Sequence, residues 1–250
     1  DLKRSNSELD AFSRSVSHDL RAPLRKIRGF IKILQENYGT QLDDMGNDLL
    51  ARTINSSMKM TELIEGLLEL SRVQKQTVVP IEIDLSELVK NLFAEMEERF
   101  PGHRVVAHCE SGCRIMGDQR LIYSALENLV NNAWKYTLKT ADAKVEFGRN
   151  VLTETIQPTG LGEYPKVLPA GTHIYFIKDN GAGFDTARAE GLFTSFQRFH
   201  RDKEFEGTGI GLSTVKRIFE KHGGYIWAQA SLGEGATFYF VLPHDPAPRE

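Results

Sequence analysis

The stretch ENLVNNAWKY, Glu127 to Tyr136, decides the fold around it. Asn128, Asn132 and Lys135 recur in it at steps of four and three, so they lie on one face of a helix that begins near Asp118. Carboxamide oxygens are good ligands for a hard cation such as Mg²⁺, and a neighbouring Lys suits a phosphate. A solvated face is the alternative, but Asn lowers helix propensity without an obvious return. We therefore interpret the stripe as a ligand-binding face.

Short strands and helices alternate on both sides of this helix. Strands are predicted at TVVPIEIDL, HRVVAHC, CRIMG, KVEFG, HIYFIKD, YIWAQA and ATFYFVL, and further helices from the capping-box pattern Asp84 to Glu87 through Phe100 and from Leu212 to His222. Mixed helices and hairpin-connected strands indicate an α+β class and an α/β sandwich over residues 77–250. The Gly- and Pro-rich stretch 148–172 is expected to form an elongated β-hairpin, with no assigned role.

The N-terminal residues 1–76 have a different, purely helical period. Apolar side chains alternate in steps of four and three in two segments separated by a polar loop at 37–46; they are Leu20, Leu24, Ile27, Ile31 and Leu34, then Leu50, Ile54, Met58, Met60, Leu63, Leu67 and Leu70. This pattern predicts an antiparallel helical hairpin. One hairpin cannot bury both apolar stripes, so we expect a homodimer that forms a four-helix bundle.

Two glycine motifs follow strand patterns in the C-terminal part. In DNGAGF, a buried Asp179 could accept a hydrogen bond from an exocyclic amine such as that of adenine, while Gly181 and Gly183 let the backbone approach a flat ring. An ordinary hairpin turn is the alternative for this motif. GTGIGL, Gly207 to Leu212, opens a helix and offers backbone N–H groups to phosphates, although its spacing is not the dinucleotide fingerprint. The polar residues 200–206 before it are expected to form a lid.

The segment SVSHDLRAPL places His18 and Asp19 a short distance before Pro23, inside the first predicted helix. A neutral, exposed imidazole is a nucleophile for phosphoryl transfer, and a neighbouring carboxylate can orient it and take its proton. Pro23 removes one helix hydrogen bond, which allows the helix to bend beyond His18.

Composition excludes few classes of protein. The chain has 250 residues, 40% of them hydrophobic and 26% charged, with a formal net charge of -3, which argues against nucleic acid as the main partner. It contains no apolar run of the roughly 20 residues that span a bilayer and no signal peptide. Its two cysteines, Cys109 and Cys113, are expected to be reduced thiols, in keeping with a cytoplasmic location. Because it begins at Asp1 within a helical pattern, we expect it to be a fragment whose parent could be membrane-anchored.

Together the motifs resemble the GHKL-type ATP-binding domain, and with SVSHDLRAPL as the H-box the chain is similar to sensor histidine kinases of the HisKA type. The H-box, the N-box ENLVNNAWKY, the G1-box DNGAGF, the F-box LFTSFQRF and the G2-box GTGIGL occur in the order of that family and span nearly the whole chain. The resemblance implies a protein-histidine kinase of a two-component system. It would autophosphorylate and then pass the phosphoryl group to an aspartate in the receiver domain of a response regulator.

The resemblance also implies roles for individual residues, with ATP and Mg²⁺ as cofactors. His18 would be the phosphoacceptor, Asp19 its neighbouring acid and Asn132 the Mg²⁺ ligand. The nucleotide site would comprise Asn128, Asn132, Lys135, Tyr136, Asp179 at the adenine amine, Gly181, Gly183, Arg201 at the terminal phosphate, and Gly207, Thr208, Gly209, Ile210, Gly211 and Leu212.

One residue departs from the family pattern. Four positions after the histidine the family commonly has a Thr or Asn that supports dephosphorylation of the regulator, whereas this chain has Ala22. The departure implies a kinase-biased protein. Upstream, the resemblance implies a sensor domain of PAS, GAF or phytochrome type.

Two alternatives stay open, as does the choice between phosphorylation within one chain and across the dimer. The first is a catalytically silent dimeric scaffold, and the second is another GHKL ATPase of gyrase or chaperone type. The intact His18, Asn132 and Asp179 argue against the first, and the hairpin with its H-box argues against the second.

Overall fold

A computed structural model describes residues 2–163, 167–186, 191–197 and 207–243, with side chains of the first helix described from Asp19 onward. The chain divides into two compact units, Asp1–Lys75 and Gln76–Glu250, each described here by itself. Within the described ranges, none of the helices combines the length and the apolar character that crossing a membrane requires.

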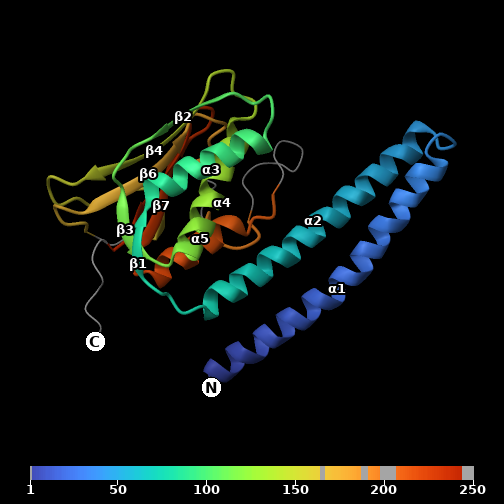
Figure 1. The fold of residues 1–250 in the computed structure, drawn as a ribbon, viewed down its shortest axis with the longest axis horizontal. Helices are drawn as coiled ribbons and strands as arrows, with labels where there is room; N and C mark the ends of the chain where they lie inside the picture. The colour runs from blue at the N-terminus through green and yellow to red at the C-terminus, as the bar shows by residue number, and fades with distance from the viewer. Residues whose placement is uncertain (1, 164–166, 187–190, 198–206, 244–250) are drawn as a thin grey trace. The chain divides into compact units, whose positions relative to one another are not determined.

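The first unit is a helical hairpin of α1 (Leu2–Tyr38) and α2 (Asp44–Lys75), as predicted (Figure 1). The loop is closed by polar contacts: the Asp43 carboxylate accepts a hydrogen bond from Gly46 N at 2.7 Å, and the Asn47 amide donates to Gly39 O at 3.1 Å. These contacts provide the cap for α2, because an Asp before a helix satisfies a free N–H group of its first turn.

The apolar seam of α1 separates into two columns. Leu24 and Ile31, seven residues apart, are buried, whereas Leu20, Ile27 and Leu34 keep 45%, 42% and 43% of their surface exposed. The hairpin therefore buries only one column of its first helix against α2. The second column remains on the surface of a single copy.

Pro23 lies inside α1, and the chain continues as helix beyond it. A hydrogen bond across the hairpin supports this region: the hydroxyl of Ser57 in α2 donates to the carbonyl oxygen of Leu24 at 3.3 Å. Ser57 is 3% exposed, so this bond is shielded from water. The helix is thus attached to its neighbour directly after the proline.

The second unit is built on a mixed six-stranded sheet. Its order is β2 (Val105–Cys109), β4 (Ala143–Val151), β6 (His173–Asp179), β8 (Gly235–Val241), β7 (Tyr225–Ser231) and β5 (Leu161–Glu163). Strands β2 and β4 run parallel, and the other adjacent pairs are antiparallel. A separate antiparallel pair consists of β1 (Ile81–Asp84) and β3 (Arg114–Gly117).

Three helices, α3 (Leu85–Arg99), α4 (Gln119–Thr137) and α5 (Gly211–Lys221), cover one face of this sheet (Figure 1). Aromatic rings fill the space between the two layers: Phe240 stacks on Phe219 of α5 with ring centroids 4.9 Å apart, and on Tyr175 at 5.6 Å. The predicted α+β class, a helical hairpin followed by an α/β sandwich, is confirmed.

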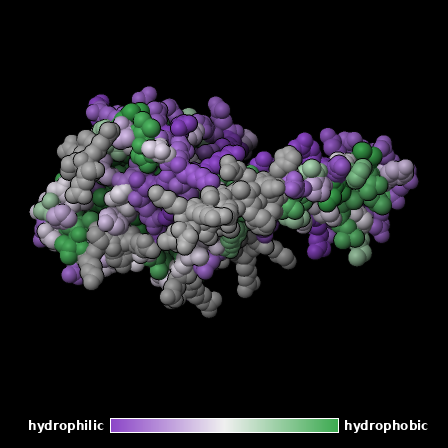
Figure 2. Space-filling view, turned by 90° about the horizontal axis from the view of Figure 1, so that it is seen from below, coloured by the Kyte–Doolittle hydropathy of each residue, from purple (hydrophilic) through white to green (hydrophobic). Residues whose placement is uncertain are grey.

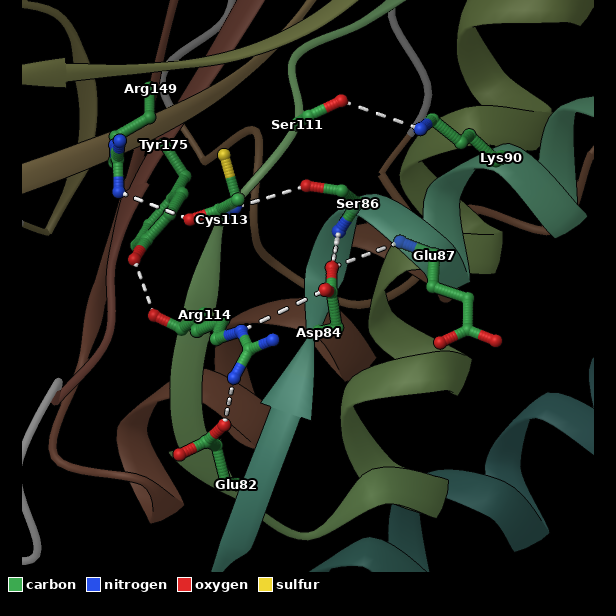
Figure 3. Close-up of polar contacts among 11 residues, drawn as sticks. Glu82, Asp84, Ser86, Glu87, Lys90, Ser111, Cys113, Arg114, Arg149 and Tyr175 are labelled. Carbon is green, nitrogen blue, oxygen red and sulfur yellow. Dashed lines mark hydrogen bonds and ion pairs between the residues drawn. The ribbon is translucent and has the colours of Figure 1, made fainter.

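Asp84 joins β1 to α3 in the way its capping pattern predicts. Its Oδ1 accepts hydrogen bonds from Ser86 N at 2.9 Å and Glu87 N at 3.2 Å, which satisfies free N–H groups at the start of α3 (Figure 3). On the other side, the Arg114 guanidinium of β3 lies 3.9 Å from Asp84 Oδ2 and 2.5 Å from Glu82 Oε1. This network connects the small sheet to the beginning of the helical layer.

The stretch 148–172 differs in part from the predicted hairpin. Its arms pair at Ile156 and Leu168, but its tip returns to the main sheet, where β5 adds an edge strand to β7. Gly160 and Gly162 allow this pairing, since a Cβ on either would stand 2.6 Å from a carbonyl oxygen of β7. Leu168 also packs with Ile174 and Trp227. The described part of the stretch therefore covers the sheet around Ile174 and Trp227.

Candidate functional site

The C-terminal half of α4 carries the polar face formed by Asn128, Asn132 and Lys135. Lys135 Nζ donates to Asn132 Oδ1 at 3.3 Å and lies 4.3 Å from the centre of the Tyr136 ring. Asn128 donates from its Nδ2 to Ser124 O at 2.9 Å, so its carboxamide oxygen points away from its own helix backbone. Amide oxygens and an ammonium group therefore stand side by side on this half of α4.

Asp179 ends β6 and is 4% exposed. Its Oδ1 accepts a hydrogen bond from Gly181 N at 2.8 Å. Burial raises the pKa of this carboxyl to about 6, and backbone hydrogen bonds from Gly181 and Ala236 oppose that rise. The site therefore contains a buried carboxylate that a single donor, such as an amine, would stabilise in its charged form.

The turn that follows Asp179 packs on the last turn of α4. Ala182 N donates to Tyr136 O at 3.0 Å, and a Cβ on Gly181 would stand 2.4 Å from the same oxygen. Gly183 has a positive φ of 57°, and a Cβ there would meet Ser231 O at 1.9 Å. Only glycine fits these two positions, which brings the carboxylate and the helix face together.

The three glycines of the GTGIGL motif lie near the same face. A Cβ on Gly207 would lie 3.3 Å from Lys135 Nζ, and one on Gly211 would lie 2.4 Å from Asn128 Oδ1. Gly209 has a φ of 72°, and its carbonyl accepts a hydrogen bond from Phe196 N at 2.8 Å. The segment before α5 therefore runs along the polar stripe of α4.

The start of α5 has no side-chain cap: Ile210 occupies the N-cap position and its side chain makes no capping bond. The N–H groups of a helix start form a ready site for anions, because four of them lack partners within the helix. Ser213 Oγ donates to Ile210 O at 2.7 Å and accepts from Ser195 Oγ at 2.9 Å. This serine pair, which no sequence pattern predicted, links the predicted F-box to the helix start.

The structure thus brings together the predicted residues of α4, the Asp179 turn and Gly207 to Leu212. His18 lies within α1 of the other unit, with its side chain outside the described residues; Asp19 beside it is exposed. Arg201 and the predicted lid 200–206 also fall outside the described residues.

The donor set fits a magnesium ion held jointly with a phosphorylated ligand. In the described part of the chain, no group of three or more His, Cys, Asp or Glu side chains is arranged to hold a metal by itself. Asn132 offers an amide oxygen next to the Lys135 ammonium group. Mg²⁺ commonly takes few protein ligands and completes its shell with water and substrate phosphates.

Two protein families match this chain. The family described as His Kinase A (phospho-acceptor) domain matches residues 8–76, and that described as Histidine kinase-, DNA gyrase B-, and HSP90-like ATPase matches residues 117–246. The second match includes the three structural parts that converge on α4.

Individual relatives agree with these matches. The chain is 33% identical over 244 residues to Cyanobacterial phytochrome B of Nostoc sp., covering 97% of this chain and 30% of the relative. It is 31% identical over 245 residues to Methanogenesis regulatory histidine kinase FilI of Methanothrix harundinacea, covering 97% of this chain and 25% of the relative. A crystal structure of full-length ShkA in complex with AMPPNP has the same fold, with a TM-score of 0.61 at 20% identity, covering 95% of this chain and 46% of ShkA.

Proposed function

This chain belongs to the sensor histidine kinases of the HisKA type, and we propose from that premise that it is an ATP-dependent protein-histidine kinase. The chain spans about a third or less of the curated relatives named above, so the proposal concerns the catalytic part of a longer signalling protein. In it, the second unit binds ATP and His18 receives the γ-phosphoryl group.

One observation carries the proposed ATP site. The turn after the buried Asp179 and the uncapped start of α5 both contact α4. Ala182 N in that turn donates to Tyr136 O, and Gly211 at the start of α5 lies against Asn128. A nucleotide has matching ends, an adenine amine that donates and phosphates that carry negative charge. We assign the adenine to Asp179 and the phosphates to Lys135 and the N–H groups of Gly207 to Leu212.

Asn132 is the protein ligand that we assign to Mg²⁺. The ion would supply charge neutralisation and orientation of the phosphates when bound. Lys135, which donates to Asn132, holds that amide oxygen in one direction. Asn128 and Tyr136 line the same face and shape the space around the nucleotide.

The transfer step needs a nucleophile without a positive charge. A ring nitrogen of neutral His18 attacks the γ-phosphorus; an N–P bond forms, the bond between that phosphorus and its bridging oxygen breaks, and ADP leaves with the electron pair. Asp19 orients the imidazole and takes its proton. Arg201 is assigned to the terminal phosphate, and in a second transfer an aspartate oxygen of a response regulator replaces the histidine nitrogen.

The exposed column of α1 supports a homodimer. Leu20, Ile27 and Leu34 recur every seven residues, the spacing of a seam between parallel or antiparallel helices. Figure 2 shows apolar side chains gathered on the surface of the hairpin. Pairing two hairpins along this column would complete a four-helix bundle.

Ala22 supports a bias toward the kinase direction. It is exposed on α1, and its methyl group offers no hydrogen bond to position a water molecule against an acyl phosphate. An upstream sensor of phytochrome, PAS or GAF type is proposed because the relative named a phytochrome extends well beyond the matched part.

Incubation with γ-labelled ATP and Mg²⁺ tests the proposed function. The wild-type chain is expected to acquire label that is lost in acid and retained in base, and the His18→Gln variant is expected to acquire none. Binding of ATP without labelling would favour a silent scaffold. Release of labelled phosphate that persists in His18→Gln would favour a GHKL ATPase of another kind.

A further inference from the structure

His222 forms a bridge between the two helices of the candidate site. It lies at the C-terminal end of α5, is 8% exposed, and its Nδ1 lies 2.7 Å from Ile218 O in its own helix. Its Nε2 lies 3.0 Å from the backbone nitrogen of Asp118, which caps the start of α4. Among the described residues, the hydrogen bonds of this histidine go to Ile218 and Asp118, which are not assigned to the nucleotide site.

Only one protonation state satisfies both contacts. A backbone N–H can only donate, so Nε2 must be the acceptor for Asp118 N, and a carbonyl can only accept, so Nδ1 must carry the proton. His222 is therefore a neutral Nδ1–H imidazole. Burial lowers its pKa, while the hydrogen bond to Ile218 acts in the opposite direction.

The ring also lies close against Gly117 of β3. A Cβ on Gly117 would stand 3.2 Å from His222 Cδ2 and 3.3 Å from Nε2. The carboxylate of Asp118 is occupied elsewhere, since its Oδ1 accepts from Arg120 N and Leu121 N at the start of α4. The imidazole is thus held between two helix ends by directed bonds as well as by packing.

Helices α4 and α5 pack against each other, with the His222 hydrogen bond at one end of the contact and the candidate site at the other. Ten residues along α4 from Asp118 is Asn128, and eleven residues back along α5 from His222 is Gly211, and these two lie against each other. Helices in contact can slide or rotate unless directed contacts fix their register. Here a hydrogen bond fixes the register at the His222 end, and the close approach of Gly211 to Asn128 limits it at the other end.

We propose that His222 is a positioning residue for the nucleotide site: by accepting the Asp118 N–H it fixes the register of α5 on α4 and so places the start of α5 opposite Asn128 and Lys135. This inference rests on the proposed ATP site. It predicts that altering His222, whose hydrogen-bond partners Ile218 and Asp118 lie outside the proposed site, changes nucleotide affinity more than it changes the transfer step.

Substitutions with side chains of different length test the two hydrogen bonds of the imidazole separately. Glutamine places an amide oxygen near the position of Nε2 and can accept from Asp118 N, whereas asparagine reaches only the position of Nδ1 and keeps the bond to Ile218. Alanine removes both. His103→Ala is a matched control, because it removes a half-buried imidazole that lies 3.1 Å from Thr137 at the opposite end of α4.

The experiment measures ATP affinity by calorimetry and KM and kcat for autophosphorylation, using the whole chain and Mg²⁺. His222→Ala and His222→Asn should raise Kd and KM about fivefold, the effect of one hydrogen bond, and change kcat less than about twofold. His222→Gln should restore most of the affinity, and His103→Ala should leave it unchanged. Thermal unfolding of each variant identifies any that fails to fold.

Several results would overturn the inference. The first is an ATP affinity of His222→Ala equal to that of wild type. The second is a folded His222→Gln that binds ATP no better than His222→Asn, and the third is a His103→Ala that weakens binding as much as His222→Ala. In each case ATP binding by the wild-type chain would still support the ATP site. A wild-type chain that bound no ATP would instead overturn the proposed function, and this inference with it.

Discussion

Gly211, the first residue of α5, lies directly against the carboxamide of Asn128 in α4, at a spacing that leaves no room for a methyl group. The same asparagine is held by its Nδ2 bond to Ser124 O. Position 211 therefore sets how closely the start of α5 can approach the polar stripe of α4. Two residues from separate sequence motifs therefore form one close contact.

Gly211→Ala is expected to weaken ATP binding about tenfold with little change in thermal stability. The added Cβ meets the end of a side chain, which can rotate, so the fold survives while Asn128 turns away from the site. Calorimetric titration with ATP and Mg²⁺ measures the effect. In an Asn128→Ala background the same substitution should cost less, and Gly29→Ala, where a Cβ meets nothing within 4 Å, should have no effect on affinity.

Asp179→Asn is expected to weaken ATP binding about 10- to 100-fold, because it removes the charge from a buried hydrogen bond. The wild-type protein should also lose affinity as the pH falls through about 6, where the carboxylate takes up a proton. Titrations between pH 5 and 8 compare the two proteins. An identical pH dependence in both would show that the phosphates of ATP, and not Asp179, are responsible.

The same residue has an opposite effect on stability. Its folded pKa, about 6, exceeds the ordinary 3.8, so the folded chain binds more protons between these values and loses stability as the pH rises through them. Asp179→Asn should therefore be more stable than wild type at pH 7.5, by about 1 kcal/mol in the free energy of unfolding, and the difference should vanish near pH 4. Differential scanning calorimetry decides it; a stability deficit of the variant at pH 7.5 would contradict the sign.

Ile27→Glu is expected to convert the proposed dimer into a monomer at micromolar concentration. It places a charge in the middle of the exposed column of α1, which the dimer would bury. Light scattering coupled to size exclusion gives the mass. Arg28→Glu, at the neighbouring exposed position, serves as the control and should remain dimeric. A monomeric wild-type chain would remove the basis for the bundle.

Ala22→Thr is expected to raise the rate at which a phosphorylated response regulator loses phosphate in the presence of ADP, by about tenfold or more. The hydroxyl would supply the hydrogen bond that Ala22 lacks, while the exposed position on α1 tolerates the larger side chain. Ala22→Val adds similar volume without the hydroxyl and should leave the rate low. Rapid dephosphorylation by the wild-type chain would contradict the proposed kinase bias.

Much of the fold could be predicted from local pattern. The side chain of Asp118 does cap a helix that ends at Thr137, and Asp84 does begin one that ends at Arg99. Strands β6 and β8 fall on the predicted stretches because apolar residues and flanking turns mark them locally. The three glycines from Gly207 to Gly211 could be found for the same reason, since a helix start has a short-range signature.

Contacts between distant segments could not be predicted in this way. The pairing of β5 with β7 depends on glycines whose need appears only when the carbonyls of β7 lie opposite them. His222 meets a backbone nitrogen 104 residues earlier in the chain, and nothing around either residue marks that partnership. The Ser195 to Ser213 bond likewise joins segments that are separated by a stretch without regular pattern.

The segment at which the second unit begins is held at the same helix ends as His222. Lys221 Nζ donates to Gln76 O, and Asp118 Oδ2 accepts from Val79 N at 3.3 Å. The attachment of this entry segment and the start of α5 therefore lie at opposite ends of two packed helices. We expect α4 and α5 to move as rigid helices. A force on the chain between Gln76 and Val79 would then reach the residues of the proposed nucleotide site through these helices, without passing through a loop.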